Sequence, residues 1–249
     1  MTRSLLFLLV AVGGCAHAPK TAPPPTFAAL VAATDRTDAD RALDPGRKPV
    51  EFLTFIGATA GMHVAELMAG GGYTTELLSR AVGPSGVVYG ENPKWVLERF
   101  AEKPWTERLA RVSNVKRLDT ELGAPFPSEL MGTLDIVVSN AIYHDAVWSK
   151  VDRDAMNHAV RDALKPAGSY VVCDSSAKPG SGVVEVETLH RIDEQVVRDE
   201  VQRAGFTVGA VGDFLRNPED TRDWSTSPRN AGERRGTGDR FCVKFVKAP

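Results

Sequence analysis

Residues 64–75, Val-Ala-Glu-Leu-Met-Ala-Gly-Gly-Gly-Tyr-Thr-Thr, constrain the possible fold of this chain more than any other segment. They combine a short apolar strand, a turn with consecutive glycines at positions 70–72, and a helix that starts at Tyr73. A turn without Cβ atoms lets the backbone approach a ligand, and the first N–H groups of the helix are free to bind it. The next apolar run, residues 87–90, ends in Glu91, a carboxylate well placed for the hydroxyl groups of a ribose. The segment therefore predicts an α/β domain that binds a nucleoside.

The residues around the turn distinguish between nucleoside cofactors. A dinucleotide fingerprint has the pattern G-x-G-x-x-G, but Thr75 stands where its third glycine would be. Glu66 precedes the glycines and favours a cofactor with a positive charge and no phosphate. The segment resembles motif I of the class I S-adenosylmethionine-dependent methyltransferases, acid-x-G-x-G-x-G, with Met68 in place of the first glycine. A nicotinamide-dependent oxidoreductase is the weaker interpretation.

Later segments resemble the same family in the same order. Residues 114–119 resemble its third strand, residues 134–140 its fourth strand and functional loop, and residues 163–172 the turn into its fifth strand. The resemblance covers residues 47–247 and implies an α/β, Rossmann-like class I methyltransferase fold. Such a fold has a mostly parallel seven-stranded sheet with an antiparallel last strand. More narrowly, residues 143–145, 175–180 and 189–193 resemble a bacterial group of exported, predicted methyltransferases.

The resemblance also implies the binding site for S-adenosyl-L-methionine. Its ligands would come from the glycine turn and from the ends of the strands, with Asp119 near the adenine amino group. The residues are Glu66, Met68, Ala69, Gly70, Gly72, Tyr73, Glu91, Asn92, Asp119 and Asn140.

Methyl transfer requires an acceptor held in line with the methyl group and, where the acceptor carries a proton, a base. His144 follows the predicted fourth strand and is the candidate base, with Tyr143 shaping the pocket and Asp145 orienting the imidazole. The alternative is a loop histidine that only packs. Three residues are candidates for contact with a small-molecule acceptor, or else for capping roles: Asp174, His190 and Arg191. The histidine and cysteine spacing supports no metal site.

The N-terminus is typical of a secretory signal. Arg3 precedes an apolar run, residues 5–12, that is too short to span a bilayer, and small residues follow it. Residues 12–15 resemble a lipobox, in which Cys15 becomes the lipidated first residue. An ordinary signal peptide with a chance cysteine is the alternative.

These features divide the chain into three parts. We expect a signal peptide at 1–14, a lipidated Cys15 with a proline-rich tether at 15–26, and one methyltransferase-like domain at 27–249. Ala16 replaces the aspartate associated with retention in the inner membrane. This predicts an exported lipoprotein of the cell envelope, anchored in the outer membrane and facing the periplasm.

Composition narrows the partners and leaves one cysteine question open. The formal net charge of −2 argues against a nucleic-acid partner. The family's strand order makes Cys173 and Cys242 neighbours, as a disulfide or, the interpretation we favour, as two buried thiols. Residues 216–238 read as a long loop, either a lid or a surface excursion. The sequence does not determine the oligomeric state.

Apolar periodicity completes the predicted elements. Helices are expected at residues 49–56, 93–100, 152–164 and 188–204, the last with an apolar stripe that includes Leu189 and Ile192. A final strand is expected at residues 240–246.

Overall fold

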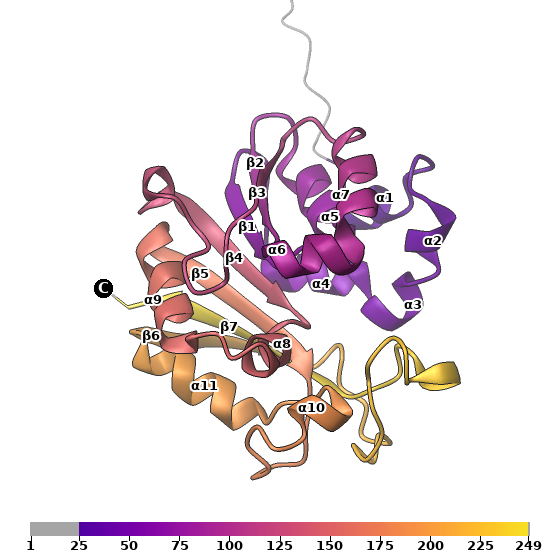
Figure 1. The fold of residues 1–249 in the computed structure, drawn as a ribbon. Helices are drawn as coiled ribbons and strands as arrows, with labels where there is room; N and C mark the ends of the chain where they lie inside the picture. Colours follow the sequence, from indigo (N-terminus) through magenta and orange to yellow (C-terminus); the bar gives the residue numbers. More distant parts are fainter. Residues whose placement is uncertain (1–24, 249) are drawn as a thin grey trace, which may run out of the picture.

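The computed structural model describes residues 25–248. The predictions for the signal peptide and for Cys15 lie outside these residues. Figure 1 shows a single twisted sheet with helices on both faces. Within residues 25–248, no helix combines the length and apolar character needed to cross a membrane.

The predicted α/β fold with a seven-stranded sheet is confirmed. The strand order is β3-β2-β1-β4-β5-β7-β6. Strands β1 to β5 are parallel to one another, and β7 is antiparallel to both β5 and β6. The strands are β1 (His63–Leu67), β2 (Val87–Glu91), β3 (Val115–Leu118), β4 (Leu134–Asn140), β5 (Leu164–Ser175), β6 (Phe206–Gly212) and β7 (Arg240–Lys247).

Alternating side chains in the strands build one core on each face of the sheet. Val64 and Val88 pack on the face that is covered by α1, α4 and α5. Ala65 and Tyr89 point to the other face, where α6 to α9 and α11 lie. The helices are α1 (Phe27–Val31), α2 (Asp38–Arg41), α3 (Asp44–Arg47), α4 (Pro49–Ile56), α5 (Tyr73–Val82), α6 (Lys94–Val96), α7 (Glu102–Leu109), α8 (Tyr143–Trp148), α9 (Arg153–Ala163), α10 (Val186–Leu189) and α11 (Glu194–Arg203).

The single helix predicted for residues 188–204 is wrong. Helix α10 ends at Leu189, His190 adopts a left-handed φ of 51°, and α11 begins only at Glu194. Ile192 instead forms a bridge with Ser176 after the end of β5. Its apolar side chain is buried by this tertiary contact, so the helical spacing was misleading.

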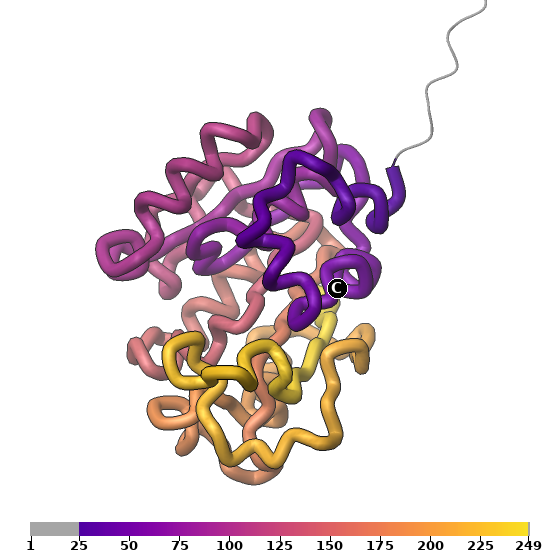
Figure 2. Tube along the Cα trace, turned by 90° about the vertical axis from the view of Figure 1, so that its right-hand side faces the viewer, coloured from indigo at the N-terminus to yellow at the C-terminus, as the bar shows by residue number. Residues whose placement is uncertain are grey.

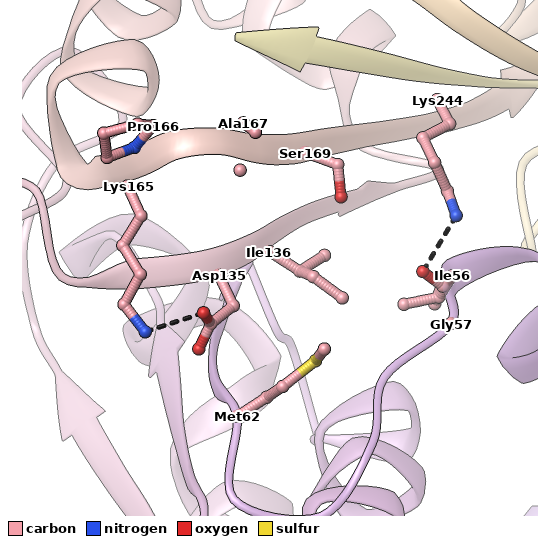
Figure 3. A pocket seen from close by; sticks show the side chains of 11 residues that line it. Ile56, Gly57, Met62, Asp135, Ile136, Lys165, Pro166, Ala167, Ser169 and Lys244 are labelled. Carbon is pink, nitrogen blue, oxygen red and sulfur yellow. Dashed lines mark hydrogen bonds and ion pairs between the residues drawn. The ribbon is translucent and has the colours of Figure 1, made fainter.

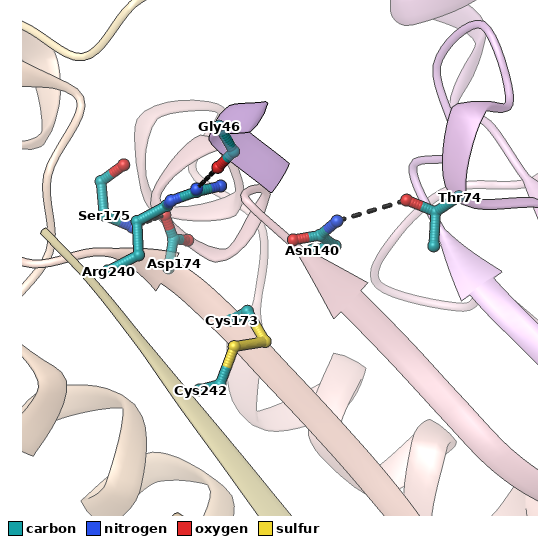
Figure 4. The surroundings of a disulfide bond; sticks show 8 residues. All are labelled: Gly46, Thr74, Asn140, Cys173, Asp174, Ser175, Arg240 and Cys242. Atoms are coloured by element: carbon teal, nitrogen blue, oxygen red, sulfur yellow. Dashed lines mark hydrogen bonds between the residues drawn. A yellow bond between two sulfur atoms is a disulfide. The ribbon is translucent and has the colours of Figure 1, made fainter. Parts of the chain in front are cut away.

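The favoured interpretation of two free thiols is also wrong in this structure. Cys173 in β5 and Cys242 in β7 are directly opposite in the antiparallel register and form a disulfide. Both residues are buried, and the disulfide links the two strands near the carboxyl end of β5 (Figure 4).

Candidate functional site

The glycine turn after β1 has an unusual backbone that is fixed by the end of β2. Met68, Gly70 and Gly72 all have positive φ angles, of 46°, 57° and 77°. Asn92 accepts a hydrogen bond from the Gly70 N–H at 2.7 Å and donates to the Gly70 carbonyl at 3.1 Å. The left-handed angle at Met68 explains why glycine suits this position, since a side chain there costs about 1–2 kcal/mol.

The glycines of this region serve different purposes. A Cβ atom on Gly72 would lie 2.5 Å from the ring of Trp105, and one on Gly90 would also collide with it. These two glycines are therefore required by the packing of Trp105, a buried residue of α7. The sequence pattern did not predict this role of Trp105. A Cβ on Gly70 would meet nothing within 4 Å. Gly70 is the glycine that leaves open space beside the turn.

The two glutamates predicted to bind the cofactor, Glu66 and Glu91, are both buried. Glu66 accepts a hydrogen bond from the Thr75 hydroxyl, and burial raises the pKa of Glu66 to about 7. Glu91 accepts a hydrogen bond from the Met68 N–H at 2.9 Å, and burial raises its pKa to about 8. The other oxygen of Glu91, Oε1, is buried without a hydrogen-bond partner among residues 25–248. An acceptor in this state costs free energy until a donor reaches it.

The remaining predicted cofactor residues lie around the same turn. The Ala69 N–H donates to the Glu91 carbonyl at 2.8 Å. The hydroxyl of Tyr73 donates to Asp44 at 2.6 Å. Asn140, at the end of β4, donates to the Thr74 hydroxyl in the first turn of α5 at 3.2 Å (Figure 4). Asp119 is exposed beyond β3 and pairs with Arg117 at 2.6 Å, so it lies on the rim.

His144 and Asp174 form a buried pair at the carboxyl ends of β4 and β5. The Nδ1 atom of His144 lies 2.7 Å from Oδ1 of Asp174, and the His144 backbone N–H donates to Oδ2 of the same carboxylate at 3.0 Å. Asp145 lies 3.5 Å from Nε2. Burial alone lowers the pKa of His144, but the charges of Asp174 and Asp145 outweigh it and raise the pKa to about 9. The imidazole is therefore in its doubly protonated, positively charged form at neutral pH.

Tyr143 and His190 have different surroundings. The hydroxyl of Tyr143 donates to Glu200 at 2.8 Å and accepts from Asn157 at 2.8 Å, so it belongs to the core under α9 and α11. The ring of His190 lies 5.5 Å from that of His144 and 5.0 Å from that of Trp148. Burial lowers the pKa of His190, and the charge of His144 lowers it further.

Arg191 fastens the long loop that precedes β7. Its side chain is 0 % exposed, pairs with Asp220 at 2.8 Å, and donates to the carbonyls of Trp224 and Ser176, each at 2.9 Å. All three guanidinium nitrogens are thus occupied within the protein, and we do not propose Arg191 as an acceptor ligand. The prediction of a long loop before β7 is confirmed, and buried ion pairs hold it in place.

The end of this loop meets the N-terminal helices. A Cβ atom on Gly46 would lie 2.8 Å from the Cα of Gly236, so the two backbones are in close contact. Figure 2 shows the loop, in yellow, beside the indigo N-terminal segment. The two segments together cover one side of the sheet's carboxyl edge.

A separate cavity of about 300 Å³ lies at the opposite edge of the sheet (Figure 3). Its lining includes Met62, Asp135 and Lys165 near the amino ends of β1, β4 and β5. Lys165 pairs with Asp135 at 2.6 Å. None of the predicted site residues contributes to it. Among residues 25–248, no group of histidine, cysteine, aspartate or glutamate side chains is arranged to hold a metal ion.

Comparison with known proteins gives structural but no sequence-family matches. No protein-family model matches the chain. The structure resembles a SAM dependent methyltransferase from Aquifex aeolicus, with a TM-score of 0.59 and 20% identity over 85% of this chain and 99% of that one. It also resembles fibrillarin from Aeropyrum pernix, solved with natively bound S-adenosyl-L-methionine (TM-score 0.53, 13% identity, 82% and 76% covered). A third similar structure is the [4+2]-cyclase SpnF (TM-score 0.55, 15% identity, 84% and 81% covered). The chain therefore has the Rossmann-like fold found in S-adenosylmethionine-dependent methyltransferases.

Proposed function

We propose that this protein is a methyltransferase that uses S-adenosyl-L-methionine and acts on a small molecule. The observation that carries the proposal is the unpartnered Oε1 of Glu91, whose other carboxylate oxygen accepts a hydrogen bond from Met68 in the glycine turn. A ribose has two adjacent hydroxyl donors, which suit a buried carboxylate oxygen at the end of the second strand. The residues present therefore fit a nucleoside, and the sulfonium of the cofactor supplies an activated methyl group when bound.

In this proposal, residues of the chain position the cofactor-binding turn and contact the acceptor. Asn92 holds the turn at Gly70 and Glu91 holds it at Met68, so the backbone of the turn is positioned before a ligand arrives. His144 contacts the acceptor in this proposal, and Asp174 fixes the orientation of its ring. Because the pKa of His144 is raised to about 9, it serves as a hydrogen-bond donor at neutral pH and as a base only at higher pH.

Two glycine substitutions test cofactor binding with a matched control. Gly70 and Gly132 both have positive φ angles, 57° and 68°, and a Cβ on either would meet nothing within 4 Å. Gly132 precedes β4, at the amino edge of the sheet. Changing either residue to alanine should cost about 1–2 kcal/mol of stability from backbone strain. Only Gly70→Ala should weaken the binding of S-adenosylhomocysteine in calorimetric titration.

The outcomes of this titration are distinct. Loss of binding in Gly70→Ala with normal binding in Gly132→Ala supports the proposal. No binding by the unchanged protein, or equal effects of the two substitutions, contradicts it. Binding without methyl transfer to any compound in an acceptor panel, unaltered by His144→Ala, would favour a non-catalytic binding module of the cell envelope.

The proposal includes export and anchoring through Cys15. The buried disulfide between Cys173 and Cys242 supports an oxidising compartment, where such bonds persist. With the lipobox-like N-terminus, this favours a lipoprotein of the outer membrane facing the periplasm. Growth with labelled palmitate should label the full-length protein but not a Cys15→Ser variant. Equal labelling of both, or labelling of neither, would contradict lipidation at this cysteine.

A further inference from the structure

In the described part of the chain, two arginines at the carboxyl edge of the sheet form no ion pair. Arg47 ends α3 and Arg240 begins β7. Within residues 25–248, no carboxylate oxygen lies within 4.0 Å of either guanidinium. Other half-buried or buried arginines nearby are paired, as Arg36 is with Asp44 and Arg108 with Asp40. Half-buried charges without counter-charges are costly, so these two positions require an explanation.

The two side chains belong to one local cluster. Arg240 donates a hydrogen bond to the carbonyl of Gly46, the residue before Arg47. The guanidinium carbon of Arg47 lies 4.4 Å above the centre of the Tyr73 ring. Burial and the positive charge of Arg47 together lower the pKa of Arg240 to about 10, although the charges of Asp174 and Asp239 act in the opposite direction. The pair is therefore a concentration of positive charge that an anion would stabilise.

The cluster lies between the two halves of the candidate site. On one side, Tyr73 directly follows the glycine turn. On the other side, Arg240 is opposite Ser175 in the strand register, next to Asp174, which holds His144. Figure 4 shows Arg240 projecting from β7 alongside Asp174 and Ser175, toward Gly46. A small molecule held by the pair would have its reacting end near the glycine turn and His144.

From this arrangement we propose that the acceptor is an anion, and that Arg47 and Arg240 bind its carboxylate or phosphate group. The inference rests on the proposed function and adds the chemical class of the substrate. A planar guanidinium donates two parallel hydrogen bonds to either kind of group. The amino-acid end of the cofactor is a less suitable occupant, because its ammonium cancels the charge of its carboxylate and the net positive charge of the site stays the same.

The test uses the full domain and separates cofactor binding from anion binding. Arg47→Gln and Arg240→Gln remove one charge each, and Arg203→Gln removes the charge of an exposed arginine on α11 as the matched control. Calorimetry measures the affinity for S-adenosylhomocysteine and for 5′-methylthioadenosine, which lacks the carboxylate. Inorganic phosphate and benzoate are then titrated into the protein saturated with S-adenosylhomocysteine.

We expect the unchanged protein and Arg203→Gln to bind phosphate or benzoate, and each site variant to bind that anion about tenfold more weakly. The affinity for S-adenosylhomocysteine should stay within about twofold in every variant. If the site variants lose affinity for S-adenosylhomocysteine but not for 5′-methylthioadenosine, the pair binds the cofactor's carboxylate and the inference is overturned. Binding of neither anion, or equal binding by all variants, also overturns it.

Two further measurements keep the result interpretable. Arg240→Lys retains the charge, and thermal unfolding of each variant shows whether loss of the bond to Gly46 has unfolded the protein. A variant that is folded, as judged by thermal unfolding, and has lost only anion binding supports the inference. If the unchanged protein does not bind S-adenosylhomocysteine, the proposed function is contradicted. In that case, titration of phosphate and benzoate into the ligand-free protein still tests whether the arginine pair binds an anion.

Discussion

Glu91 gives the sharpest quantitative prediction. Burial raises its pKa from 4.5 to about 8, because the carboxylate has lost water and the one hydrogen bond it receives, from Met68, offsets that loss only in part. At pH 7 a group with that pKa is about 90% protonated. A nucleoside that donates hydroxyl groups to Glu91 stabilises the charged form and so lowers the pKa. Binding at pH 7 should therefore release about 0.9 protons from this residue.

Calorimetry in two buffers with different ionisation enthalpies measures the number of protons released. S-adenosylhomocysteine is titrated into the unchanged protein, into Glu91→Gln, and into Glu129→Gln. Glu129 is an exposed carboxylate whose charge does not contribute to the raised pKa of Glu91, and it serves as the control. We expect Glu91→Gln to abolish most of the proton release and Glu129→Gln to leave it unchanged. Equal proton release by the unchanged protein and Glu91→Gln would refute the reasoning.

The same pKa predicts how stability depends on pH without ligand. The folded state holds the Glu91 proton more tightly than the unfolded state, so the stabilisation is complete below pH 4.5. It is lost as the pH rises through about 8. The upper limit of this loss is about 5 kcal/mol. Urea unfolding between pH 5 and pH 9, roughly the window set by these pKa values, should show a smaller decline for Glu91→Gln than for the unchanged protein. Parallel declines would contradict the assignment.

Three other substitutions or treatments have definite expected results. Asp174→Asn removes the larger of the two charges that raise the pKa of His144, so this pKa should fall from about 9 in an NMR titration; a value that stays near 9 would contradict this. Gly72→Ala should destabilise the protein by more than about 2 kcal/mol in urea unfolding, because the new Cβ meets Trp105, whereas Gly70→Ala should cost only the strain. Disulfide reduction should lower the free energy of unfolding by about 4 kcal/mol, given the loop it closes, and two free thiols in the unreduced protein would exclude the bond.

Local patterns in the sequence located most of the strands and several helices. The strand that leads to the glycine turn, the one that ends at Glu91, and the predicted helix at residues 49–56 agree with β1, β2 and α4. These elements are recognisable because apolar alternation, turn glycines and proline at a helix start act within a few residues. The pattern failed at residues 188–204, where Ile192 is buried by a contact with Ser176 rather than by a helix face.

The candidate site was only partly visible in the sequence. His144 was predicted from its place after β4, and Asp174 from its place at the end of β5, but not that the two side chains pair. Trp105 was missed, although it is the reason that Gly72 and Gly90 cannot carry a side chain. Arg47 and Arg240 were also missed as a pair, since only folding brings residues so far apart in the chain together.

The sequence alone determined the order of strands and helices, the glycine turn, and the acidic residues at the ends of β1 and β2. These features depend on short-range preferences and on the two-residue and 3.6-residue periodicities of the backbone. Tertiary structure decided the disulfide between Cys173 and Cys242, the protonation of Glu91 and His144, and the clustering of two arginines without acids. Disulfide formation, ion pairing and side-chain pKa values depend on the distances between groups and on the exclusion of water. Both are set when segments remote in the sequence pack together.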